Sequence, residues 1–214
     1  MTSDALPAAP ADVPPLHGEP LPLEFANTVF PVRGELRDVL DSPQGLAWWL
    51  GACRDRLATP LSDSDLRGVG ATDVDCFVML RDATRRLVDA HVDGRAPDAW
   101  DVAQVNRVSS VGRPWPMLRW SGAGRPAALE VSTAPPLVAV QAEVAHGLIA
   151  LLSGAGAGDV RACRAPGCVF FFDHARSRRE WCSTGCGNRA RVARHYARHQ
   201  RGRRLPNGQK LSSS

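Results

Sequence analysis

The residues best suited to chemistry are four cysteines in the last quarter of the chain. Cys163, Cys168, Cys182 and Cys186 follow the pattern Cys-x4-Cys-x13-Cys-x3-Cys. Two close pairs separated by a dozen or so residues can converge on one tetrahedral ion, because each pair supplies two thiolates from one turn. The spacing therefore predicts one Zn²⁺ per chain. With all four positions filled by protein, this zinc would be structural and not catalytic.

The same residues allow two alternatives to this zinc site. The cysteines could form disulfides, but the opening MTSDALPAAPADVPP lacks the basic flank and apolar stretch of a secretory signal. We therefore expect a cytoplasmic chain, in which disulfides are disfavoured. His195 and His199 could also bind a metal, but four cysteines already complete the site. Cys53 and Cys76 lie at or near apolar helical positions and are expected in the core.

Turns beside the cysteines must hold the two pairs in place. Pro166 and Gly167 bend the first pair, and Ser183–Gly185 bend the second. Roughly 55 residues with few large apolar side chains cannot build a sufficient core by themselves. Metal binding can supply on the order of 10 kcal/mol to a small zinc module. The zinc is thus expected to be the main source of folding energy there.

An arginine-rich helix is predicted directly after Cys186, since GNRARVARHYARHQR contains no proline. One arc of a helical wheel holds Arg191, Arg194, His195, Arg198 and Arg201, and the other side holds Ala190, Val192, Ala193, Tyr196 and Ala197. The apolar side is expected to pack on the zinc knuckle, where Arg189 would brace the fold. About 15 helical residues span ~22 Å, enough for a DNA major groove. The candidate DNA contacts are Arg176, Arg178, Arg179, Asn188, Arg191, Arg194 and Arg198.

The charge distribution also points to nucleic acid. The net charge is +4, but residues 1–158 hold 13 Arg against 19 acids, a balance of −6. Residues 159–214 hold 12 Arg and one Lys against three acids, a balance of +10. An arginine-rich genome would explain the scarcity of Lys, but not why acids vanish after Glu180. No apolar anchor accompanies the charge, so double-stranded DNA is favoured over a membrane as partner.

The rest of the chain predicts a mainly helical α+β fold. Apolar periodicity places helices over 21–30, 44–57, 73–92, after Pro97, and from Pro136 to about 153. Met117–Ser121 and Ala127–Ser132 predict a β-hairpin. The expected division is a disordered leader over 1–18, a helical domain over 19–153, a zinc finger with basic helix over 159–204, and a tail over 205–214. We expect residues 1–153 to fold without zinc.

Residues 163–198, CRAPGCVFFFDHARSRREWCSTGCGNRARVARHYAR, resemble the CGNR zinc finger, which is named for the tetrapeptide Cys186–Arg189. The shared features are the APGC knuckle, the Phe-Phe-Asp strand, the arginine-rich bridge and the WCS before the third cysteine. His174 departs from the pattern, in which Thr or Ser follows the Asp. The N-terminal part, with LEFANTV, resembles the ABATE domain that commonly precedes this finger. The resemblance implies a bacterial transcription regulator described as stress-induced, whose N-terminal domain senses an effector.

Several functions remain open at this stage. A DNA-binding regulator is favoured, and the alternative is a zinc-stabilised module that binds RNA or an acidic protein. No phosphate loop, metal-ligand cluster or nucleophile elbow occurs before the linker, and His17, His91 and His146 are scattered, so an enzyme is not expected. Five tryptophans of the helical domain fit either its core or an apolar effector pocket: Trp48, Trp49, Trp100, Trp115 and Trp120. A homodimer would raise DNA affinity.

Overall fold

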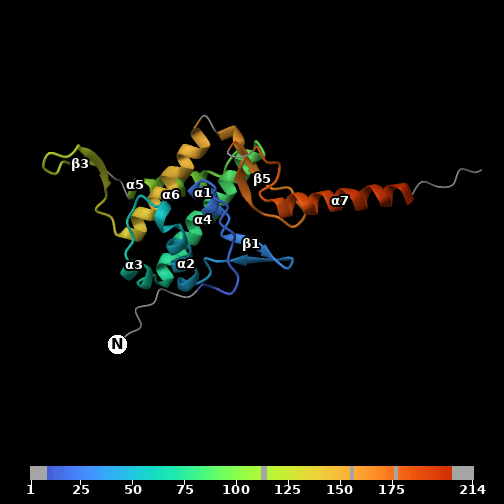
Figure 1. Ribbon diagram of the computed structural model, residues 1–214, viewed down its shortest axis with the longest axis horizontal. Coiled ribbons are helices and arrows are strands. Elements are labelled where there is room, and N and C mark those ends of the chain that lie inside the picture. The colour runs from blue at the N-terminus through green and yellow to red at the C-terminus, as the bar shows by residue number, and fades with distance from the viewer. Residues whose placement is uncertain (1–8, 112–114, 155–156, 176–177, 204–214) are drawn as a thin grey trace, which may run out of the picture.

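Long helices form where apolar residues repeat every three or four positions. The computed structural model describes residues 9–111, 115–154, 157–175 and 178–203. Its body is built from α4 (Ala71–Val92), α5 (Ala99–Val111) and α6 (Pro136–Ser153), which pack against one another (Figure 1). The short α1 (Leu21–Ala26) packs against α4 and α6, while α2 (Pro43–Cys53) packs against α4 and carries α3 (Asp63–Arg67) on it. The mainly helical body predicted from periodicity is confirmed.

Local signals explain where these helices begin and end. The Ser42 side chain accepts a hydrogen bond from the Gly45 N–H at the start of α2, and Pro43 occupies the first helical position. Helix α4 ends at Val92, and Gly94 follows the cap with a φ of 62°, the left-handed conformation that glycine adopts at low cost. The prediction that Gly94 stops this helix is therefore confirmed.

Two hairpins flank the helical body. Strands β1 (Val29–Val32) and β2 (Glu35–Asp38) pair antiparallel through a two-residue Arg33-Gly34 turn, in which both residues have positive φ. The helix expected over 21–30 is therefore wrong beyond Ala26. Strands β3 (Trp115–Arg119) and β4 (Ala127–Val131) form the hairpin that was expected, and Figure 1 shows it projecting from the body.

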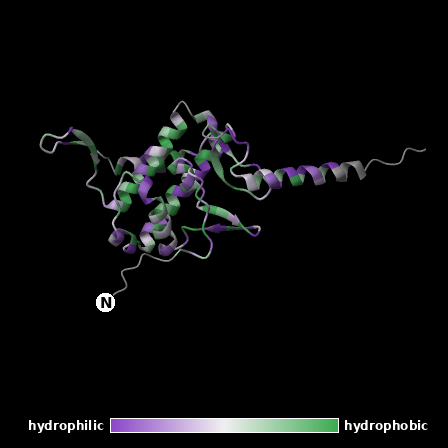
Figure 2. Ribbon diagram, viewed as in Figure 1, coloured by the Kyte–Doolittle hydropathy of each residue, from purple (hydrophilic) through white to green (hydrophobic). Residues whose placement is uncertain are grey.

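The core of the body is aromatic at its centre. Phe25 lies between Trp49 and Phe77, with ring centroids 5.1 Å and 6.1 Å apart, and all three side chains are fully buried. Figure 2 shows apolar residues gathered along the helices of the body. Trp100, Trp115 and Trp120 are instead exposed. The expectation that the tryptophans share a core or a pocket thus applies to Trp49 and, in part, to the half-buried Trp48.

Helix α6 is long and apolar enough to cross a membrane by length and composition alone. It packs against α1, α4 and α5, and Val140, Val144 and Leu148 on it are buried. This packing explains its apolar character as that of a core helix. Helix α6 also determines where the cysteine-containing segment begins, because the chain continues from its end at Ser153 toward Cys163.

The segment before α1 has neither helix nor strand from residue 9 to residue 20. Pro14 and Glu19 within it are nevertheless buried. Within the leader expected over 1–18, Pro14 is thus buried, while most of its other described residues are exposed. Residues 1–8, like the tail expected over 205–214, lie outside the described residues.

Candidate metal centre and nucleic-acid interface

A third hairpin and a helix bring the four cysteines together. Strands β5 (Val160–Ala162) and β6 (Phe171–Asp173) pair antiparallel, with Cys163 directly after β5 and Cys168 three residues before β6. Helix α7 (Thr184–Arg203) carries Cys186 in its first turn, and Cys182 lies just before it. Each predicted ligand pair therefore comes from a different element, as the spacing required.

The sulfur positions fit one structural zinc. The four Sγ atoms lie within 4.8 Å of one another. Cys182 Sγ is 3.6 Å from Cys168 Sγ and 3.4 Å from Cys186 Sγ. Thiolates held at about 2.3 Å from a tetrahedral zinc would be about 3.8 Å apart. Three of the four cysteines are buried and Cys168 is half-buried, which matches a closed site without an open position.

Backbone hydrogen bonds shape both knuckles. In the first, the Cys163 N–H donates to the Phe170 carbonyl (2.8 Å) and the Cys168 N–H to the Ala165 carbonyl (3.0 Å). Gly167 has a φ of 72°, which explains why glycine stands in this turn. In the second, the Cys186 N–H donates to Ser183 Oγ at 3.2 Å. The predicted turn residues therefore do hold the pairs.

Hydrogen bonds among the thiols make Cys163 the first of them to ionise. Hydrogen bonds from Cys168, the larger contribution, and from Cys182 lower the pKa of Cys163. The same shared bonds raise the pKa of Cys168 and Cys182, so a metal must displace their protons to bind. Arg189 Nη2 lies 3.0 Å from Cys186 Sγ and donates to it. Arg189 thus braces the site, as its position on the wheel indicated.

The cysteine module is fixed to the helical body by a paired hydrogen bond. Asn27 Nδ2 donates to the Phe171 carbonyl, and the Phe171 N–H donates to Asn27 Oδ1, both at 2.9 Å. Asn27 is buried at the end of α1, so these bonds are shielded from water. Sequence reasoning noted LEFANTV but gave Asn27 no role, because its partner lies 144 residues away.

Charged side chains extend this attachment. The carboxylate of Glu19, also buried, accepts a hydrogen bond from the Asp173 N–H at 2.9 Å and forms an ion pair with Arg179. The Arg85 guanidinium of α4 lies 5.4 Å from the centre of the Phe171 ring and donates to the Val169 carbonyl. The apolar side chains of the cysteine module and of the body form one continuous core.

The predicted DNA contacts fall into two groups. Arg178, Asn188, Arg191, Arg194 and Arg198 are exposed, and all but Arg178 lie along α7. Arg179 is different, since it pairs with Glu19 and its guanidinium stacks 5.4 Å from the Phe172 ring centre. We assign Arg179 to the attachment of the module and not to the exposed basic surface. Arg176 lies outside the described residues.

Helix α7 stands away from the body instead of lying on it (Figure 1). Ala190 is buried, but Val192 and Tyr196 are 55% and 64% exposed. The expectation that the apolar side packs on the zinc knuckle is thus wrong beyond Ala190. The apolar side stays exposed because Cys186 fixes only the first turn of α7. From there the helix axis points away from the body, so the later turns have no other described residues to pack against (Figure 1). Both sides of the helix are left free for a partner.

Comparison with protein families agrees with this arrangement. The model of the ABATE domain, described as "Putative stress-induced transcription regulator", matches residues 19–155. The model of the CGNR zinc finger matches residues 160–199, which include all four cysteines. Neither is a family of enzymes. A search of curated proteins gives no match. Since the first model covers more than half of the chain, the protein belongs to the ABATE family and joins that domain to a CGNR zinc finger.

Proposed function

We propose that this protein is a cytoplasmic bacterial transcription regulator that binds double-stranded DNA through α7. The observation that carries the proposal is the free basic helix. Every described side chain from Arg191 to Arg198 is exposed, and no acidic residue follows Glu180. The zinc site anchors one end of this helix, so the remainder can enter a groove without disturbing the fold.

The dimensions of α7 suit a major groove. Its 20 residues give a length of about 30 Å at 1.5 Å per residue. The major groove of B-DNA, about 12 Å wide, admits an α-helix. Arg191, Arg194 and Arg198 lie three or four residues apart and so share one face. Asn188 lies near the start of α7, Arg178 precedes the helix, and both are exposed, so we propose that they contact the phosphate backbone.

The test begins with selection of bound duplexes from fragmented genomic DNA, followed by affinity measurements at several salt concentrations. The triple variant R191A/R194A/R198A should bind the selected duplex much more weakly, and its log affinity should fall less steeply with log salt, by about 0.9 per lost contact. The matched control R37A/R67A/R107A removes three exposed arginines from β2, α3 and α5, away from α7 and the β3–β4 hairpin, and should bind normally. Equal weakening by both variants would show that net charge, not α7, drives binding.

Adding competitors to the same binding experiment distinguishes DNA-binding regulation from the alternative function. A zinc-stabilised module that binds RNA or an acidic protein would lose its selected duplex to single-stranded RNA or to an acidic peptide at physiological salt. A DNA-binding regulator keeps its duplex under this competition, because specific sites are bound about 10³–10⁷ times more tightly than bulk nucleic acid.

We further propose that residues 19–153 sense an effector and residues 159–204 respond. The shared core supports this division of labour, since a change in α1 or α4 reaches the zinc finger through Asn27 and Arg85. Whether Arg85 transmits such a change is tested by measuring DNA affinity for the variants Arg85→Lys and Arg67→Lys. The first should alter affinity while the zinc content stays constant. The second changes an arginine of α3, away from the interface, and should not.

We also propose that the protein forms a homodimer through its β3–β4 hairpin. In the β3–β4 hairpin, Leu118 and Trp120 are 67% and 63% exposed, and contacts of this hairpin with other described elements are few. Two-stranded hairpins are marginal alone in water, so we propose that a second copy covers this one. Sedimentation should show a dimer that L118D/W120D converts to a monomer. Leu36→Asp, which changes an equally exposed leucine of β2, should leave the dimer intact.

A further inference from the structure

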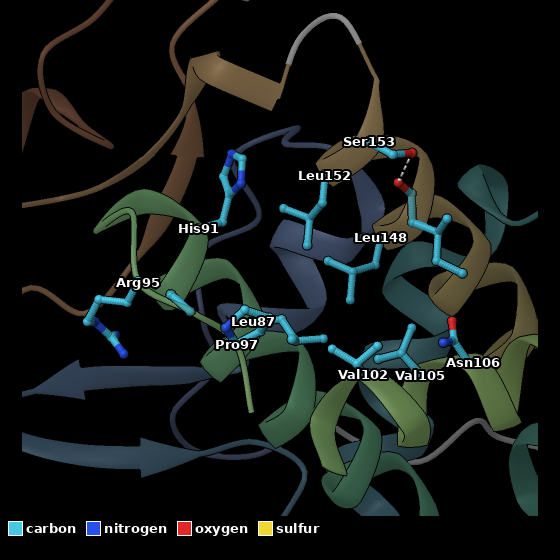
Figure 3. A pocket seen from close by; sticks show the side chains of 12 residues that line it. Leu87, His91, Arg95, Pro97, Val102, Val105, Asn106, Leu148, Leu152 and Ser153 are labelled. Carbon is cyan, nitrogen blue, oxygen red and sulfur yellow. Dashed lines mark hydrogen bonds between the residues drawn. The ribbon is translucent and has the colours of Figure 1, made fainter. Parts of the chain in front are cut away.

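A cavity of about 340 Å³ opens between α4, α5 and α6. Its walls are mainly apolar, and Figure 3 shows Leu87, Val102, Val105, Leu148 and Leu152 pointing toward a common centre. Leu87, Val105 and Leu148 are buried, so the floor of the cavity is formed by core residues. None of the five tryptophans lines it.

The polar groups at the rim of the cavity indicate whether a charged or an uncharged ligand would bind. His91 and Arg95 lie at one side of the apolar centre and Asn106 at the other (Figure 3). Arg95 is already paired with Asp89 at 2.5 Å and approaches Asp93 at 3.7 Å. An anionic ligand would have to break these ion pairs, so the rim gives it no net attraction. The Asn106 side chain has no hydrogen-bond partner among the described residues and can accept one polar group of a ligand.

The size of the cavity limits the ligand. A cavity of about 150 Å³ holds benzene. A volume of about 340 Å³ is near the lower end of the range for small-molecule sites, and corresponds to roughly fourteen non-hydrogen atoms on that scale. A flat two-ring compound or a short aliphatic chain would fill it.

The cavity also lies under the joint between the two family regions. Ser153, which lines it, is the last residue of α6, and the chain then runs through the short 3₁₀ helix η2 (Ala157–Asp159) into β5. His91 Nε2 lies 2.7 Å from the Ala157 carbonyl. Beside Arg95, Asp93 accepts a hydrogen bond from Arg164, next to the zinc ligand Cys163. A ligand would therefore touch residues that hold the zinc finger in place.

We infer that this cavity binds a small, uncharged, predominantly apolar molecule, which acts as the effector; the effector role rests on the proposed regulatory function. The molecule places its apolar part among the leucines and valines and one hydroxyl or carbonyl group near Asn106. Its binding changes the packing of His91 and Ser153 and so the position of the finger.

The test uses the full zinc-loaded chain with two probes of similar size, uncharged 1-naphthol and anionic 1-naphthoate. Calorimetry should show that naphthol binds at least tenfold more tightly than naphthoate. Val102→Trp fills the cavity and should weaken naphthol at least tenfold. Ala103→Trp adds the same ring at the next position of α5, outside the cavity, and should have no effect. If Val102→Trp does not fold, Ile149→Trp fills the cavity from α6.

The outcomes are distinct. Naphthol binding that survives Val102→Trp and Ile149→Trp, or naphthoate binding as tight as naphthol, overturns the site. Where naphthol binds as expected, the selected duplex is titrated with and without it. An at least threefold change in DNA affinity, absent in Val102→Trp, supports the effector role, and an unchanged affinity overturns that role. Failure to bind any DNA would instead refute the proposed regulator while leaving the ligand site standing.

Discussion

The side chain of Asn27 joins the helical body to the zinc finger. It satisfies both the N–H and the carbonyl of Phe171 in a position shielded from water. Asn27→Ala leaves both groups unpaired, and each unpaired buried group costs about 1–3 kcal/mol. We expect the free energy of unfolding to fall by about 2–4 kcal/mol in urea titrations. Asn106→Ala, at an exposed position, should change it little; equal effects would contradict the assigned role.

Two glycines in the first turn of α7 make a matched pair. A Cβ at Gly187 would lie 3.2 Å from Trp181 Cδ1, whereas one at Gly185 would meet its nearest neighbour, Ser183 Oγ, at 3.8 Å. Alanine in place of glycine stabilises a helix by roughly 0.5–1 kcal/mol. Gly185→Ala should therefore tighten zinc binding in chelator competition, while Gly187→Ala should lose part or all of this gain because Trp181 has to move. A larger gain for Gly187→Ala would disprove the packing argument.

Among the described residues, helix α7 is attached to the rest of the protein only through its first turns. Val192 and Tyr196 are exposed, so V192A/Y196A should alter the free energy of unfolding by no more than about 0.5 kcal/mol. Ala190 is buried beside the zinc centre, and Ala190→Asp should lower the melting temperature by several degrees because it buries a carboxylate. Thermal unfolding of the two variants, compared with the native chain, checks this. Substantial destabilisation by V192A/Y196A would mean that the outer turns pack on the protein.

The sequence predicted elements better than it predicted contacts. Helices such as α4 and α6 could be predicted because a 3.6-residue apolar repeat is a local property, and the cysteine spacing is local in the same sense. The β1–β2 hairpin was missed, because its turn places Arg33 in the left-handed region, where a sequence search does not expect arginine. The pairing of Asn27 with Phe171, and that of Glu19 with Arg179, joins distant segments. The residue pattern within one segment cannot predict which distant residue it will contact.

The same nonlocal contacts change what is expected of the whole molecule. Considered as sequence, residues 1–153 looked self-sufficient, with a net charge and an apolar pattern of their own. In the structure, Phe170, Phe171 and Phe172 join the core of the body, and Asn27, Glu19 and Arg85 take their partners from the finger. Removing the finger would leave these groups buried without partners or newly exposed. Zinc therefore stabilises more of the chain than the 45 or so residues around it.

Zinc removal provides the decisive measurement. Because α1 and α4 hold the finger directly, chelation should reduce amide hydrogen-exchange protection in both helices as well as in β5 and β6. Cys182→Ser should reproduce this pattern, since it removes a buried ligand, whereas Cys76→Ser changes a cysteine outside the metal centre and should not. Helix α3 packs against α2 and serves as the internal reference. If α1 kept its full protection in zinc-free protein, the helical body would fold independently, and any signal from it would have to reach α7 by a route other than the shared core.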